Sequence, residues 1–166
     1  MAAAAARPAR LQALSRIFIL NDLVLLLFVS MYFGTGWSLV LFSFPIAPRL
    51  TVDNYYLQFV PQVTAATRFF TVMTMLMIVS ATIMIFSLWG TALAWLPVLV
   101  IAGVIAATLL TEIWILPLNK QMSAGIKDPT QLGGIIGRWM ALNRVRVGLW
   151  TVQWLAMAAF FGIKAL

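Results

Sequence analysis

The chain has 166 residues, of which 63% are hydrophobic and only 9% are charged, and it carries a formal net charge of +7 with no cysteine and no histidine. A soluble domain needs about 25% charged residues to keep its surface wet, so this composition excludes an ordinary soluble domain and predicts one lipid-embedded domain. The absence of cysteine and histidine excludes disulfides, thiolate metal sites and a histidine base, and argues against any protein-supplied metal site.

The N-terminal segment, residues 1–16, is rich in alanine and arginine and is followed by an apolar run. A signal peptide is disfavoured because Asn21 and Asp22 interrupt the run early and no small-residue cleavage site follows. We therefore expect a retained first span over about 17–44, which is tilted or projects beyond the bilayer. Asp22 lies inside this span, and we expect it to pair with Lys164 on the same membrane face.

Three further apolar runs, over about 69–89, 92–116 and 139–165, can each cross a bilayer as a helix, because about 30 Å of hydrocarbon requires about 20 residues. Backbone groups in lipid must satisfy one another, which favours helices. Pro117 is expected to end the third span. A short uncharged turn, LWGTAL, makes the second and third spans antiparallel neighbours. The sequence thus predicts an all-α, integral membrane, antiparallel four-helix bundle, as a single domain over 1–166.

Two connecting segments differ in character. Between the first two spans, PIAPRLTVDNYYLQFVPQV predicts a short interfacial helix with Tyr55 and Tyr56 at headgroup depth. Between the last two spans, NKQMSAGIKDPTQLGGIIG is the most polar segment and predicts a loop. The cations lie singly at the ends of apolar runs, which favours anionic lipid over nucleic acid as their partner. Their distribution on the two sides leaves the membrane orientation open.

Glu112 is a carboxylate within the third span, shortly before Pro117 and at the end of the bundle where Arg68, Arg144 and Arg146 are expected. We expect it to be ionised and held by one of these arginines. Two interpretations remain open: a structural ion pair that fixes helix register, or a base or counter-ion that lines a cavity.

The fourth span carries a polar and aromatic stripe. At 100° per residue six side chains fall on one narrow face: Trp139, Asn143, Arg146, Trp150, Gln153 and Met157. Such a stripe should face protein or a cavity, because an unpaired amide in lipid is costly. Arg144 points away from the stripe and can reach the headgroups. The stripe is either packing with amide hydrogen bonds between helices or the wall of a site.

Two short motifs occur together in this four-span chain. Pro117-Leu118-Asn119 closes the third span, and Trp139-x-x-x-Asn143-x-x-Arg146 opens the fourth. With FGTGWSLVLFSFPIAPRL in and after the first span, the chain resembles the anthrone oxygenase-like family of small four-helix membrane proteins. Most bacterial members of that family have no assigned function. The resemblance covers nearly the whole chain in topology.

The resemblance implies a cofactor-independent monooxygenase that oxidises a polycyclic phenolic such as an anthrone to a quinone with O₂, without metal or flavin. In this chain Glu112 would be the base, and Arg146 with Asn143 would donate hydrogen bonds to the enolate oxygen. Four residues are assigned to binding the substrate in an apolar slot for its rings: Asn119, Trp139, Trp150 and Gln153. Members with the claimed activity tend to carry histidine where this chain has Asn143, and an amide takes up no proton near neutral pH.

The sequence thus favours a multi-pass protein, expected in a bacterial inner membrane, that binds or oxidises a hydrophobic aromatic molecule. The alternative is a non-catalytic subunit or assembly partner within a larger membrane complex or homo-oligomer. A transporter ranks lowest, because no span is broken centrally and no chain of ionisable groups crosses the midplane.

Overall fold

The computed structural model describes residues 2–166, and within that range the chain is helical with no strand. The predicted all-helical class is confirmed for the described residues. Four long helical units follow one another, and two of them contain a π-helical turn. They are α1 (Ala2–Ser38) with η1 (Leu39–Ser43), α2 (Tyr55–Ser87), α3 (Trp95–Leu110) with η3 (Thr111–Ile115) and α4 (Leu116–Ser123), and α5 (Pro129–Ala165). A short 3-10 turn, η2 (Ala47–Arg49), follows η1.

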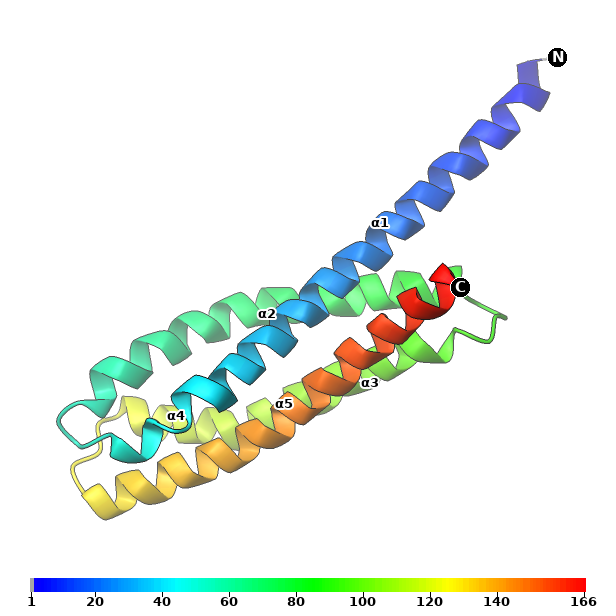
Figure 1. Cartoon of the computed structure of the whole chain (residues 1–166). Helices are drawn as coiled ribbons and strands as arrows, with labels where there is room; N and C mark the ends of the chain where they lie inside the picture. The colour runs from blue at the N-terminus through cyan, green and yellow to red at the C-terminus, as the bar shows by residue number, and fades with distance from the viewer. Residues whose placement is uncertain (1) are drawn as a thin grey trace.

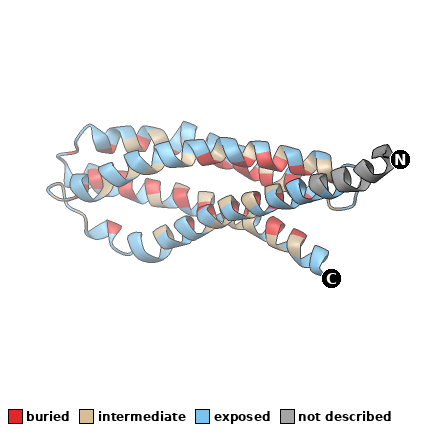
Figure 2. Ribbon diagram, turned by 90° about the horizontal axis from the view of Figure 1, so that it is seen from above, coloured by how far each residue is buried: buried red, intermediate tan, exposed pale blue. Residues whose placement is uncertain are grey.

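The long helices form a closed ring, in which α1 and α3 each pack against both α2 and α5. The connections from η1 to α2 and from α4 to α5 lie at one end of the ring, and the turn between α2 and α3 lies at the other end, near the C-terminus (Figure 1). In that turn Gly90 has φ +77°, a conformation that favours glycine. Figure 2 colours the ribbon by burial, and buried residues (red) alternate along the helices with exposed ones (pale blue).

All four helical units are long and apolar enough to cross a membrane. The helices extend beyond the predicted spans, because α2 begins at Tyr55 and α5 begins at Pro129. The separate interfacial helix predicted before the second span is therefore wrong, as is most of the loop predicted before the fourth. At the start of α5, the Asp128 carboxylate accepts hydrogen bonds from the backbone N–H groups of Thr130 and Gln131, both at 3.1 Å. This N-cap, followed by proline, starts a helix efficiently.

Pro117 does not end the third helical unit, contrary to prediction. It lies in the first turn of α4, directly after the π-helical turn η3, and the N–H of Leu116 donates to the carbonyl oxygen of Thr111 five residues earlier. The same arrangement precedes Pro45, where the N–H of Phe44 donates to the carbonyl oxygen of Leu39 at 3.0 Å. The wide π turn before Pro117 re-satisfies backbone groups around this proline, so the helix continues through it, whereas η1 ends at Ser43, just before Pro45.

The buried side chains form two apolar clusters. One fills the middle of the ring and includes Leu25, Met77, Val100, Val147 and Trp150. The other lies where the ends of α2 and α5 meet α4, and includes Phe44, Tyr55, Met122 and Trp139. On α5 the change from one cluster to the other falls between residues 139 and 147, which is where Asn143 and Arg146 lie. The second cluster explains why the helices continue beyond the predicted spans.

The predicted pair of Asp22 and Lys164 is confirmed. The Lys164 Nζ lies 4.0 Å from Asp22 Oδ2, and it also lies 4.5 Å from the centre of the Phe160 ring. Asp22 is buried, whereas Lys164 is about half exposed. The pair joins the first and last helices near the C-terminal end of the bundle.

Gly36 lies at a close approach of α1 to α5. A Cβ atom at Gly36 would lie 2.7 Å from Trp150 Cε3 and 2.9 Å from Val147 Cγ2, whereas one at Gly34 would meet nothing within 4 Å. We expect Gly36→Ala to lower the free energy of unfolding by about 1 kcal/mol, because overpacking costs about 1–3 kcal/mol and the helix preference of alanine returns up to about 1 kcal/mol. Gly34→Ala should be neutral or stabilising. Unfolding by SDS titration in micelles measures both, and equal effects would contradict the close contact.

Candidate functional site

The polar and aromatic stripe on α5 faces the interior of the bundle, as its periodicity predicts. Five of its residues, Trp139, Asn143, Trp150, Gln153 and Met157, are buried, and Arg146 is partly buried. Arg144 is exposed, and its guanidinium carbon lies 5.4 Å from the centre of the Phe44 ring. The two arginines therefore occupy different environments, one inside the bundle and one at its surface.

Arg146 lies between aromatic and hydroxyl groups. Its guanidinium carbon is 4.7 Å from the centre of the Trp150 ring, a cation–π arrangement, and its Nη1 donates to Thr111 Oγ1 at 3.4 Å. Its Nε is buried and has no hydrogen-bond partner in the structure. Among the residues that the structure describes, the one ion pair is that of Asp22 and Lys164, so no carboxylate there balances the Arg146 charge.

Two amide side chains on the same face of α5 also have unpaired atoms. Asn143 Nδ2 donates to the carbonyl oxygen of Trp139 at 2.8 Å, but Asn143 Oδ1 is buried without a partner. Both polar atoms of Gln153 are buried without a partner, and the side chain packs against Gly103 of α3. Buried polar groups are nearly always hydrogen-bonded, so a row of unpaired atoms is unusual. Interhelical hydrogen bonds of Asn143 and Gln153, which belong to one of the two interpretations of the stripe, are absent from the described part of the chain.

The two sequence motifs meet in space. Trp139 Nε1 donates to Asn119 Oδ1 at 3.0 Å, which joins the start of the fourth span to α4. The Trp139 ring is in edge contact with Phe59 at 4.5 Å and with Phe44 at 5.9 Å between ring centres. Trp139 therefore packs among protein side chains on these sides. Its substrate-binding role and that of Asn119 stay predictions.

Glu112 does not form the predicted ion pair. It is exposed, and it lies within 4 Å of no arginine that the structure describes. The physical reason is helix phase: at 100° per residue Glu112 lies about 140° around the axis from the buried Ala107. Thr111, its neighbour in sequence, takes the inward position and contacts Arg146. Glu112 and Arg146 are not brought together, and the proposed role of Glu112 as a base stays a prediction.

Sequence reasoning missed two hydroxyl residues near Arg146, Thr111 and Tyr32. The Tyr32 ring lies edge-on to Trp150 with ring centres 4.9 Å apart. Its hydroxyl donates to the carbonyl oxygen of Phe70 at 2.8 Å, so the Thr74 hydroxyl, 2.7 Å away, must be the donor to Tyr32. A signal existed for both, since a hydroxyl within an apolar run requires a partner.

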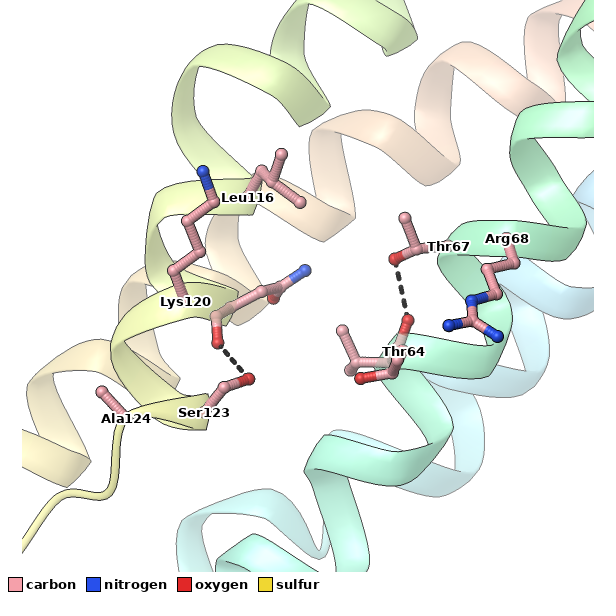
Figure 3. Close-up of a pocket in the computed structure, with 9 residues that line it drawn as sticks. Thr64, Thr67, Arg68, Leu116, Lys120, Ser123 and Ala124 are labelled. Carbon is pink, nitrogen blue, oxygen red and sulfur yellow. Dashed lines mark hydrogen bonds between the residues drawn. The ribbon is translucent and has the colours of Figure 1, made fainter.

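Two open grooves lie on the outside of the bundle, and Arg146 lines neither. The first, between α2 and α4, has a volume of about 510 Å³, and its lining includes the polar residues Arg68, Asn119 and Lys120 (Figure 3). The second, between α1 and α2, has a volume of about 550 Å³ and is apolar except for Arg68. Arg68 thus lines both grooves.

Neither a scan against protein-family models nor searches of curated proteins and solved structures give a significant match to this chain. The resemblance to the anthrone oxygenase-like family therefore stays a prediction, which depends on the motif residues Asn119, Trp139, Asn143 and Arg146.

Proposed function

We propose that this chain is a multi-pass integral membrane protein, an antiparallel four-helix bundle that binds a hydrophobic aromatic molecule through an acidic or anionic oxygen at Arg146. Four apolar helices of sufficient length support the membrane assignment. So does the outer surface of the bundle, where large apolar side chains are exposed, among them Leu27, Val72, Leu109 and Val152. Lipid solvates such a surface, whereas water does not.

The Arg146 environment carries the proposal. A guanidinium inside a bundle loses hydration, and without a carboxylate this cost is uncompensated. Here Arg146 rests on Trp150 and its Nε has no partner. Ionisable groups within membrane helices are costly and commonly mark functional sites. An aromatic ligand with a phenolate or enolate oxygen would supply the missing anion, and its ring would match the aromatic groups around Arg146.

The resemblance suggests the reaction. An anthrone-type CH₂ group and O₂ would give a ketone and water, so that one oxygen atom enters the quinone and the other leaves as water. A base removes the doubly benzylic proton, Arg146 stabilises the enolate oxygen, and the resulting carbanion reduces O₂. Asn143 Oδ1 is unpaired and is an acceptor, so it suits a phenolic hydroxyl better than an enolate. The proposal assigns the reaction no metal or flavin.

Binding and turnover can be measured separately in lipid nanodiscs. Under nitrogen, a dihydroxyanthrone should quench the tryptophan fluorescence of the wild-type protein, and Arg146→Met should weaken this binding about tenfold or more, the loss of one charge-assisted hydrogen bond. Arg144→Met, an exposed matched control, should leave it unchanged. On admission of O₂, the wild type should consume one O₂ for each quinone formed.

Each outcome has a distinct meaning. Binding without O₂ uptake above the protein-free rate would overturn the oxygenase reaction but leave the ligand site. If the wild type did not bind the ligand and could be purified only together with other membrane proteins, the ligand site would be overturned and the subunit role favoured. Equal losses in the two arginine variants would show that interior placement of Arg146 has no special part in binding.

A further inference from the structure

We propose that the groove between α2 and α4 holds the phosphate of an anionic phospholipid, with one acyl chain in the adjoining groove between α1 and α2. This inference rests on the proposed membrane insertion and is independent of the aromatic ligand at Arg146. Three features support it: two cations, one amide donor, and an adjoining apolar groove that Arg68 also lines.

The two cations lie on opposite walls of the first groove. Arg68 comes from α2 and Lys120 from α4, and the gap between the two helices separates them (Figure 3). Both are exposed, and within residues 2–166 neither forms an ion pair with a carboxylate. No acidic residue lines the groove. Guanidinium binds phosphate in a bidentate manner and ammonium binds it as a point charge, so the pair suits a phosphodiester.

The amide of Asn119 adds a third donor to this groove. An indole N–H can only donate, so the hydrogen bond from Trp139 Nε1 fixes the Asn119 oxygen and leaves its NH₂ group available. The hydroxyls of Thr67 and Ser123 donate to carbonyl oxygens of their own helices, at 2.8 and 2.9 Å. These two hydroxyls are therefore not available to donate to a ligand. The donors that remain, Arg68, Lys120 and Asn119, all suit a ligand that only accepts hydrogen bonds.

The second groove provides the place for a chain. Apart from Arg68 it is lined by apolar side chains from α1 and α2: Phe28, Met31, Phe69, Val72, Met73 and Leu76. A free phosphate ion would use only the first groove. A phospholipid would use both, because its charged headgroup and its acyl chain are joined near Arg68. This continuity favours a lipid over a free anion.

The level of Arg68 along α2 also fits a headgroup. Before Arg68 the exposed face is mixed, with Gln58, Gln62 and Thr64 beside Leu57. After it, the exposed face is mainly large and apolar, from Phe69 to Phe86. That stretch is about 27 Å long at 1.5 Å per residue, close to the thickness of the hydrocarbon core. Lys120 likewise follows the exposed apolar residues Ile113 and Trp114.

Native mass spectrometry of the full-length protein tests the site. The protein is released from micelles that contain equal amounts of phosphatidylglycerol and phosphatidylcholine. We expect the wild type to retain phosphatidylglycerol with a preference of about tenfold, from two interfacial cations. The double variant Arg68→Gln/Lys120→Gln should lose that preference. Arg49→Gln/Lys127→Gln removes the same charge from exposed residues outside both grooves and should keep it.

Three results would overturn the inference: no preference in the wild type, equal losses in the two double variants, or displacement of the lipid by inorganic phosphate at equal concentration. The last would identify a free-anion site. Retention of each variant in membranes after alkaline extraction is measured in parallel. If alkali extracted the wild-type protein from membranes, membrane insertion itself would be contradicted. If the wild type stayed in membranes but showed no preference for phosphatidylglycerol, only the lipid site would be contradicted.

Discussion

Replacing Arg146 with methionine is expected to raise the free energy of unfolding of the unliganded protein by about 1–4 kcal/mol, the range in which apolar replacement of buried charges stabilises proteins. The guanidinium has one long hydrogen bond, of 3.4 Å to Thr111, and a buried Nε without a partner. Methionine fills similar space without a desolvation cost. SDS titration of the purified protein measures the change.

Arg144→Met is the matched control for this stability change. Arg144 is exposed and lies on the same helix, so its replacement should change the free energy of unfolding by less than about 0.5 kcal/mol. If Arg146→Met instead destabilised the protein by more than about 1 kcal/mol, the contacts of Arg146 with Trp150 and Thr111 would be structural bonds that outweigh desolvation. The site would then need no ligand to explain its charge.

Tyr55→Phe is expected to lower the free energy of unfolding by about 1–3 kcal/mol, the cost of leaving a buried polar group unpaired. The Tyr55 hydroxyl accepts from the backbone N–H of Ile126 and donates to the carbonyl oxygen of Met122 at 3.1 Å. Phenylalanine would leave the Ile126 N–H without this partner. The Met122 carbonyl would keep its hydrogen bond from Gly125 N–H, at 3.3 Å.

Tyr56→Phe provides the control for that substitution, because Tyr56 is exposed and makes no hydrogen bond through its hydroxyl to the described residues. We expect it to be neutral. A Tyr55→Phe variant as stable as Tyr56→Phe would mean that the start of α2 does not hold the loop between α4 and α5. Because this contact closes the second apolar cluster, the test also checks why the helices continue past the predicted spans.

Hydropathy predicted the four helices well, because long apolar runs satisfy their backbone hydrogen bonds within helices. It did not predict where they begin. Residues 55–68 and 129–138 are too mixed in character to be recognised as helix from hydropathy. They are helical because Tyr55, Met122 and Trp139 are buried in one apolar cluster, which joins distant parts of the chain. The continuation of the helix through Pro117 likewise depends on the π turn before it, which no local sequence pattern predicted.

Within the candidate site, periodicity predicted the inward stripe on α5 because a helix fixes which side chains share a face. The same periodicity places Glu112 far from Ala107, so the expected ion pair relied on proximity along the span and neglected helix phase. Thr111 and Tyr32 could not be assigned to Arg146 from sequence, because their proximity depends on how α1 and α3 pack against α5. The pair of Asp22 and Lys164 was predictable from the order of spans alone.

The most direct test of the central claim, that Arg146 is a cation held for a ligand oxygen, is the ligand-induced change in melting temperature of the wild type and of Arg146→Met in nanodiscs under nitrogen. A dihydroxyanthrone at a concentration 100 times its dissociation constant should raise the free energy of unfolding of the wild type by about 2.7 kcal/mol. The same concentration should stabilise Arg146→Met by much less, although the unliganded variant melts at the higher temperature. Equal stabilisation of both proteins would contradict the claim.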